Sequence, residues 1–269
     1  MLHYHARMIA LRLCSSAFVA TLVLLASAGA AEAQDDRPRR TRVGLGPQLV
    51  PSYPGADGIS LRPFVDVVSA RGTDSLPFEA PDESAGFAVL TRGRFAIGPA
   101  LGFEGSRTAR DVGAALPKVG ATFEAGGFLQ YALTDMIRLR GEVRKGLGGH
   151  KGLIANVGGD YVARKGDDWL FSIGPRVTFA DGRYHDAFFS VAPAVAVATG
   201  LRAFDAKGGL QAAGITAGFV RHLGGRWGVS SYAKYDRLVD DPARSPIVLR
   251  YGSRNQVSGG LALTYTFGG

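Results

Sequence analysis

The side chains best suited to acid–base chemistry at neutral pH are three histidines beyond residue 33: His150, His185 and His222. His185 precedes Asp186, and a carboxylate can orient a catalytic imidazole. Neighbouring residues of a strand point to opposite faces, however, which argues against that pair. No two of these histidines are four positions apart, the spacing that lets two imidazoles share a metal ion. We therefore expect no enzymatic activity, no cofactor and no metal.

A second chemically capable group consists of charges that alternate with apolar residues or glycine, as on a strand with one charged and one apolar face. Between residues 136 and 145 these charges are Arg138, Arg140, Glu142 and Arg144. In other segments they are Arg94, Glu104, Glu124 and Arg176. We expect them to point into an enclosed interior. Because charges in a confined interior are normally paired, we favour an interior filled by ion pairs, with an anion pathway as the alternative. Two expected pairs are Arg94 with Glu104 and Arg176 with Asp160.

The elements that would position these charges are short alternating segments, which recur about twelve times at lengths typical of membrane-crossing strands. The predicted strands are 42–50, 59–69, 76–91, 94–104, 119–131, 136–145, 152–162, 168–179, 185–192, 210–222, 226–236 and 256–267. This pattern predicts an all-β fold, a closed antiparallel transmembrane β-barrel of about twelve strands. With this count the longer loops, at 51–58, 105–118, 193–209 and 237–255, do not all fall at one end. Ten or fourteen strands therefore remain open.

The N-terminal segment has the features of a secretory signal peptide. Two arginines precede an apolar run over 13–26, which is too short to cross a bilayer as a helix, and an A-x-A cleavage site follows at 31–33. We therefore expect a signal peptide over 1–33 and an outer-membrane barrel domain over 34–269.

The composition beyond the signal peptide is basic, with 29 basic and 22 acidic residues and a net charge of +7. The arginines alternate along strands instead of clustering with exposed aromatic residues, so we do not expect nucleic-acid binding. The only cysteine, Cys14, lies within the signal peptide. The barrel domain therefore has no disulfide and no thiol chemistry.

The strand at the C-terminus points to a cellular compartment. Its odd positions are apolar or glycine, its even positions are mostly small or hydroxylated, and it ends on the aromatic pair Tyr265 and Phe267. Bacterial outer-membrane barrels typically end on such a strand, whose phenylalanine serves as the assembly signal. We therefore expect the bacterial outer membrane, with Trp169, Trp227 and Tyr265 at the membrane interfaces.

A longer motif lies before that strand, Y-x-R-L-x-x-D-x-x-x-S-P-[IV]-V, whose defined positions include Tyr235, Arg237, Leu238, Asp241, Ser245 and Pro246. A shorter match, P-S-Y-P-G, contains Tyr53 and Gly55. With these motifs the chain resembles the family of outer-membrane proteins named after the MltA-interacting protein and OmpV, over essentially the whole barrel domain. The resemblance implies a barrel without catalytic residues. For the founding member it implies a scaffold that links a lytic transglycosylase to a murein synthase, whereas other relatives resemble surface antigens or adhesins.

The function we expect is a scaffold for murein-processing protein complexes of the cell envelope. Its partners would be outer-membrane lipid, a lytic transglycosylase and a murein synthase. We expect the longest loop, 237–255, to bind the partners, and Ser245-Pro246 to shape the turn before the last strand. The alternatives are a narrow, weakly anion-preferring pore and a surface adhesin or antigen.

Overall fold

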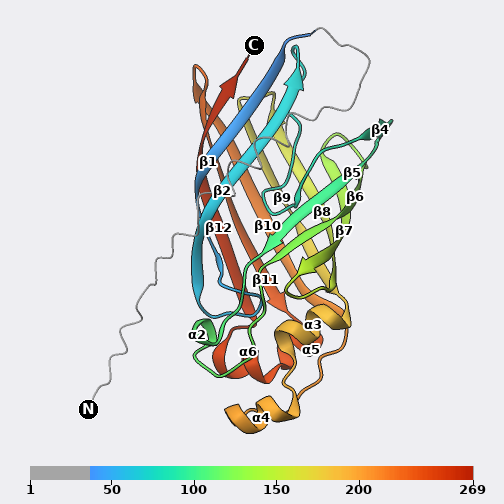
Figure 1. Cartoon of the computed structure of the whole chain (residues 1–269). Coiled ribbons are helices and arrows are strands. Elements are labelled where there is room, and N and C mark those ends of the chain that lie inside the picture. The colour runs from blue at the N-terminus through green and yellow to red at the C-terminus, as the bar shows by residue number, and fades with distance from the viewer. Residues whose placement is uncertain (1–36, 269) are drawn as a thin grey trace, which may run out of the picture.

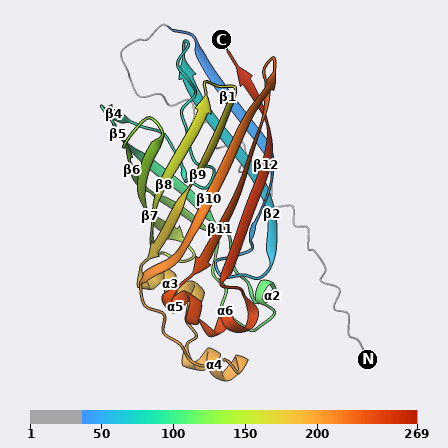
Figure 2. The ribbon, with the colours of Figure 1, turned by 180° about the vertical axis from the view of Figure 1, so that it is seen from behind.

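A computed structural model describes residues 37–268. Within them, one antiparallel sheet of twelve strands curls around an interior (Figures 1 and 2). Ten strands have ten or more residues: β1 (Arg39–Pro51), β2 (Ile59–Arg71), β5 (Phe95–Glu104), β6 (Thr122–Ala132), β7 (Ile137–Gly148), β8 (Leu153–Lys165), β9 (Trp169–Ala180), β10 (Gly209–Gly224), β11 (Trp227–Leu238) and β12 (Asn255–Phe267). Two are short: β3 (Ala85–Gly86) and β4 (Leu90–Arg92). The predicted signal peptide over 1–33 lies outside the described residues.

The order of the strands brings the two ends of the sheet's sequence together. β12 pairs with both β1 and β11. From β5 to β11, each strand pairs with the next strand along the chain. Within residues 37–268, β2 pairs with β1 alone, and the outer side of β5 carries only β3 and β4. The predicted all-β antiparallel sheet is confirmed, whereas closure of the barrel between β2 and β5 is not observed.

Alternating side chains give the sheet two different faces. On β7 the side chains of Arg138, Arg140, Glu142 and Arg144 are buried, and those of Ile137, Leu139 and Val143 are exposed. The same outward apolar surface continues around the sheet, where large hydrophobic side chains such as Leu261, Leu263, Phe171 and Ile215 are exposed. Such a surface suits a lipid environment. Among the described residues, no helix is long and apolar enough to cross a bilayer.

The two ends of the sheet differ. Short turns at 133–136, 166–168 and 225–226 join strands at the end where the C-terminus lies. At the opposite end most connections are long, except for the turn at 149–152 between β7 and β8. They carry all the helices of residues 37–268: α2 (Ala109–Val112), α3 (Gly182–Phe189), α4 (Pro193–Thr199), α5 (Asp240–Arg244) and α6 (Pro246–Tyr251). We call residues 105–121, 181–208 and 239–254 the helical cap. All four long loops predicted from the sequence therefore lie at one end.

Two predicted strands are wrong, which explains the difficulty in placing the loops. Segment 185–192 is mostly helix α3, which starts where the Asp181 carboxylate accepts a hydrogen bond from Tyr184 N at 2.9 Å. Its buried residues follow helical rather than strand spacing: Tyr184, His185, Phe188 and Phe189. In segment 76–91, only β3 and β4 are strand, and the chain before them folds into the interior. We call residues 73–84 the interior segment.

The main apolar core lies in the helical cap rather than inside the sheet. It joins α3 and α6 to the rim of the sheet and is centred on fully or almost fully buried residues: Tyr53, Tyr184, Phe188, Phe189, Val191, Leu238, Ile247 and Val248. Aromatic rings pack at short range here, with 5.0 Å between the ring centres of Tyr184 and Phe188. The cap is therefore a well-packed layer of helices and loops that covers one end of the sheet.

Candidate functional site: the charged interior

The interior of the sheet holds a continuous set of ion pairs, which we call the interior network. Strands β6, β7, β8, β9 and β11 contribute Glu124, Arg138, Arg140, Glu142, Arg144, Asp160, Arg176 and Lys234, and the interior segment contributes Asp82 and Glu83. Their side chains are 2–11% exposed, except for Lys234 at 20%. Inward positions of neighbouring strands place these groups within reach of one another.

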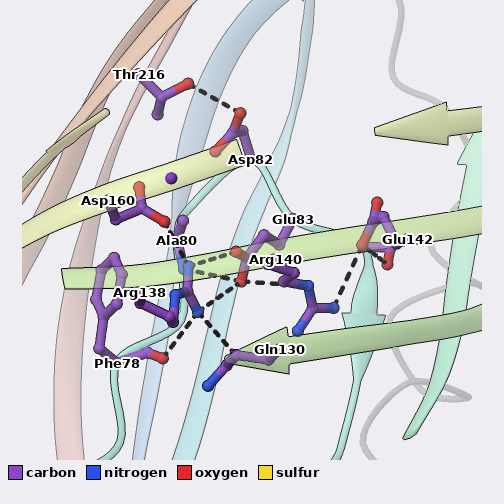
Figure 3. A network of polar contacts seen from close by, with 12 residues as sticks. Phe78, Ala80, Asp82, Glu83, Gln130, Arg138, Arg140, Glu142, Asp160 and Thr216 are labelled. Atoms are coloured by element: carbon purple, nitrogen blue, oxygen red, sulfur yellow. Dashed lines mark hydrogen bonds and ion pairs between the residues drawn. The ribbon is translucent and has the colours of Figure 1, made fainter. Parts of the chain in front are cut away.

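Asp160 is the link between β7 and β9. One of its carboxylate oxygens accepts from Arg138 Nη2 at 2.7 Å, and the other accepts from Arg176 Nη2 at 2.6 Å. Arg138 also donates to Gln130 Oε1 at 3.1 Å and lies over the Phe78 ring, 4.3 Å from its centre (Figure 3). Each guanidinium is thus held by more than one partner, as buried charges require.

A second group of pairs lies nearer to the helical cap. Arg144 Nε donates to Glu124 Oε2 at 2.8 Å, and Arg144 also pairs with Glu142. His150 Nε2 lies 3.0 Å from Glu124 Oε1, while Gly152 N donates to His150 Nδ1 at 3.1 Å. Because Nδ1 accepts, Nε2 is the nitrogen that carries the proton toward Glu124. This bond connects the interior network to the base of the cap.

The interior segment is bound to the sheet through its carboxylates. The Asp82 carboxylate receives two bonds from Arg176, Nε to Oδ2 at 3.0 Å and Nη2 to Oδ1 at 3.1 Å. Lys234 Nζ lies 3.2 Å from Asp82 Oδ2, and Thr216 Oγ1 donates to the same oxygen at 2.8 Å. Glu83 pairs with Arg138, and both residues appear in Figure 3. The segment thus fills the interior and neutralises the cations of three strands.

A small cavity lies among these groups. A cavity of about 30 Å³ is lined by residues that include Asp82, Arg140, Arg176 and Lys234. That volume holds about one water molecule. Within residues 37–268, no group of three His, Cys, Asp or Glu side chains is arranged to hold a metal ion.

Most of the predicted interior charges lie where the strands bring them together, but Arg94 does not. Arg94 is exposed at the turn between β4 and β5, where it bonds to the carbonyl of Leu133. Glu104 is at the other end of β5, and its Oε1 accepts from Gly105 N at 3.0 Å. A strand of this length separates its ends by about 30 Å. The predicted pair of Arg94 with Glu104 is therefore wrong, whereas Arg176 does pair with Asp160.

Sequence reasoning missed Asp82, Glu83 and Lys234 as members of the network. The stretch Pro77-Phe-Glu-Ala-Pro81 contains a usable signal, because proline is rare within central strands. Two prolines four positions apart argue against a continuous strand over 76–91. They give no indication that the following carboxylates would turn inward.

The family-motif residues lie where the cap meets the sheet. Gly55 has φ of +88°, and a Cβ there would lie 2.8 Å from Val248 Cγ2, so a side chain would collide with α6. Gly55 N donates to Gln256 Oε1 at 3.0 Å. Tyr53 and Leu238 are buried in the core of the cap, and burial raises the pKa of the Tyr53 hydroxyl. This part of the motif joins the first loop to α6.

The rest of the motif fixes α5 and α6 at the rim. Ser245 Oγ donates to the Phe189 carbonyl at 2.7 Å, and Pro246 begins α6. Asp241 accepts from Lys207 N and from Arg244, each at 2.8 Å, and these two bonds hold its pKa below the usual value. At the edge of the sheet, Tyr235 Oη and Arg237 Nη1 both donate to Asn255 Oδ1, at 2.8 and 3.1 Å.

The aromatic residues at the end of β12 face outward at the short-turn end. The ring of Tyr265 lies 4.8 Å from those of both Trp227 and Phe267, with the pairs edge to face. Trp227 and Phe267 are about half exposed. This cluster has the composition of an aromatic belt at a membrane interface.

Comparison with solved structures finds outer-membrane proteins of low similarity. A monoaromatic hydrocarbon channel, CymD, is 11% identical, with 84% of this chain and 87% of that chain covered and a TM-score of 0.35. An outer membrane channel from Pseudomonas putida F1 is 11% identical, with 89% and 98% covered and a TM-score of 0.35. A bacterial polysaccharide outer membrane secretin is 8% identical, with 87% and 100% covered and a TM-score of 0.36.

Comparison with curated proteins finds no match. A family model does match, and it spans almost the whole described sheet and cap. Its description is MltA-interacting protein MipA, and it covers residues 43–267. The predicted family and the predicted location in the bacterial outer membrane are both confirmed by this match. The chain therefore belongs to the MltA-interacting protein family of bacterial outer-membrane proteins.

Proposed function

We propose that this protein is an outer-membrane scaffold for murein-processing enzymes and does not act as a constitutively open pore. The family name supports a lytic transglycosylase as partner. The observation that carries the proposal is the occupied interior, where the interior segment pairs with Arg138, Arg176 and Lys234 on the inner face of the sheet. An interior occupied by paired charges leaves the outer surfaces and the connections between strands for partner binding.

The surface for murein enzymes is the short-turn end. Outer-membrane barrels have short turns on the periplasmic side and longer loops outside, and murein lies in the periplasm. Loop 237–255, which we expected to bind these partners, belongs to the helical cap and hence to the outer end. We therefore place the partner-binding surface at the short-turn end and not at loop 237–255.

That rim is basic. Arg92, Lys165, Arg221 and Arg226 are exposed at or beside its turns. Two acidic residues are also exposed at these turns: Asp135 between β6 and β7, and Asp168 between β8 and β9. A basic surface steers an acidic partner surface and fixes its orientation. We define Arg92, Arg221 and Arg226 as the rim arginines.

The test is a binding assay with purified lytic transglycosylase and murein synthase. Changing the rim arginines together (Arg92→Glu, Arg221→Glu, Arg226→Glu) should lower the affinity by at least about tenfold, since each contact of this kind contributes on the order of 1 kcal/mol. The matched control carries the same charge change on exposed cap arginines (Arg183→Glu, Arg202→Glu, Arg250→Glu). Loss of binding only in the cap variant would contradict the proposed orientation.

A surface adhesin is the second candidate, because the cap has one poorly buried apolar element. None of the residues of α4 is buried, and Val197 is 88% exposed. The exposed Leu249 of α6 lines a surface groove with Gly200 and Leu201, which follow α4. Exposed apolar patches often mark interaction sites. Cells that display Val197→Asp should adhere less to a host-protein surface than cells that display the wild type, if this candidate holds.

A further inference from the structure

The positions of Asp82 and Glu83 point to a binding function that the scaffold proposal does not use. Both belong to the interior segment, which has no strand structure. Their partners Arg138, Arg176 and Lys234 belong to β7, β9 and β11, which are paired on both sides. The cations are thus part of the rigid sheet, and the carboxylates are on a connecting loop. In this respect the loop resembles a ligand held in a receptor.

The site around Asp82 has the full geometry of a carboxylate receptor. Arg176 makes two parallel bonds to the two carboxylate oxygens, at 3.0 and 3.1 Å. This two-point contact is the arrangement by which arginine recognises carboxylates. Lys234 and the hydroxyl of Thr216 complete the set, at 3.2 and 2.8 Å. Four donors from three strands converge on one carboxylate.

The neighbouring cation, Arg140, has a hydrogen-bond donor without a partner among the described residues. Arg140 is buried, and its Nη2 donates to Glu142 Oε2 at 3.3 Å. Its Nε lies 3.8 Å from Glu83 Oε2, too far for a hydrogen bond, and has no hydrogen-bond partner among the described residues. Arg140 also lines the small cavity together with Asp82, Arg176 and Lys234. A second acidic group placed in this cavity would meet the unsatisfied Nε of Arg140.

The connection of the interior segment to the sheet allows it to leave. It enters the interior after β2 and rejoins the sheet at β3, between the two long strands that are not hydrogen-bonded to each other within residues 37–268. Its exit would therefore break ion pairs but no long ladder of backbone hydrogen bonds. At its start, Leu76 is fixed by Asp167, which accepts from Leu76 N at 3.0 Å, and by Arg164, which donates to Leu76 O at 2.8 Å.

We propose that the interior is a binding site for small di- and tricarboxylates, with Asp82 and Glu83 as internal occupants that the solute replaces. Arg176, Lys234 and Thr216 hold one carboxylate of the solute, and Arg138 and Arg140 hold another. Displacement of the segment also opens the interior, and the cations that remain favour anions. This inference goes beyond the scaffold proposal: both start from the occupied interior, but solute binding concerns the interior and partner binding concerns the rim.

The main test replaces residues 75–84 by ten Gly and Ser residues, which keeps the chain length but removes the internal carboxylates. In planar bilayers the variant should conduct at least about tenfold more than the wild type, prefer chloride to potassium, and be blocked by citrate. Adding Arg176→Gln should weaken the citrate block about tenfold, the effect of losing one charged hydrogen-bonded contact. The matched control is the same Gly and Ser segment with Asp82 and Glu83 retained, which should conduct less.

A reversible lock separates movement of the segment from a leak elsewhere. A Cβ on Gly218 would lie 3.4 Å from Pro81 Cγ and Cδ and 2.9 Å from Ser172 Oγ, so cysteines at positions 81 and 218 would be close neighbours. Because Cys14 is the only cysteine and precedes the described residues, the pair Pro81→Cys and Gly218→Cys can be studied alone. Added to Asp82→Asn and Glu83→Gln, the lock should give low current when oxidised and higher, citrate-sensitive current when reduced.

Heat-modifiable migration on gels shows which variants have folded, and only those are interpreted. A folded Gly and Ser variant that stays closed, prefers cations or ignores citrate would overturn the proposal. So would equal current in the oxidised and reduced forms of the locked protein. Loss of murein-enzyme binding with an intact citrate response would affect only the scaffold proposal.

Discussion

The interior of the sheet and the core of the helical cap are both buried, but they are built from opposite chemistry. The interior is held by ion pairs such as Arg138 with Asp160, whereas the cap is held by packed aromatic rings such as Tyr184 and Phe188. Apolar contacts are non-directional and tolerate adjustment, whereas buried charges tolerate no missing partner. The two regions should therefore fail in different ways when single side chains are removed.

The largest effect is expected in the interior. Asp160→Leu removes the shared partner of Arg138 and Arg176 and leaves two buried guanidinium groups short of a counter-charge. Breaking a buried pair costs about 3–5 kcal/mol, and here we expect the upper end of that range. Urea unfolding of the protein in lipid vesicles measures the change. Asp168→Asn, at an exposed carboxylate, is the control and should shift the free energy of unfolding by less than about 0.5 kcal/mol.

A smaller and more local effect is expected in the cap. Phe188 is 1% exposed, and Phe188→Ala leaves a cavity that costs about 3 kcal/mol. Because the sheet does not depend on this ring, heat-modifiable migration should persist while protease cuts the cap faster. If the whole sheet unfolded together with the cap, the two regions would form one cooperative unit, and the prediction that they respond separately would be wrong.

The two faces of β7 provide the next test. Leu139 is 45% exposed on the outer face, and Leu139→Arg should cost about 2–4 kcal/mol near the membrane midplane. Arg140→Leu should cost less, because Glu142 keeps its pair with Arg144 and Glu83 keeps its pair with Arg138. Refolding yield and urea unfolding measure both. An equal or reversed order would show that the charged face does not face inward.

The smallest effect concerns pH and the cap. His185 is fully buried beside the carbonyl of Lys207 and the side chain of Gln211, with Asp181 and Asp241 as the nearby carboxylates, and burial holds its pKa below the ordinary value. The unfolded cap binds the proton more readily, so the stability that comes from the neutral ring is present above about pH 6.5 and is lost as the pH falls below it.

Protease sensitivity of the cap should therefore increase between pH 7.5 and pH 5, by at most about 1.4 kcal/mol per pH unit in the underlying free energy. His185→Gln removes the titrating group and should flatten this dependence. A pH profile that is unchanged in His185→Gln would assign the effect to another group. Heat-modifiable migration of the sheet should show no such dependence on His185.

The contrast between interior and cap also explains what could be predicted from the sequence. The ten long strands were predictable because one face meets lipid and the other meets packed side chains, which produces strict alternation, as at Ile137, Arg138 and Leu139. Segment 185–192 misled the prediction because an apolar, aromatic run fits a buried helix as well as a strand. The capping carboxylate of Asp181 was the signal that distinguishes them.

The interior segment could not be found in the same way. Asp82 and Arg176 are separated by 94 positions, and nothing local marks one as the partner of the other. Their contact depends on the curvature of the whole sheet and on the gap in pairing between β2 and β5. The family motif, by contrast, was readable as sequence, but its role at the junction of cap and sheet required Gly55, Ser245 and their distant partners to be seen together.

The position of β12 has a consequence for biogenesis. Although it is the last of the described strands, β12 is not an edge: it pairs with β11 over residues 255–265 and with β1 over residues 259–260 and 263–267. A folding factor that captures this strand by its free backbone must therefore act before β1 docks. Strand β1 would then replace the folding factor as the partner of β12. The rate at which Thr41 and its neighbours pair with Phe267 and its neighbours would set the time of release into the membrane.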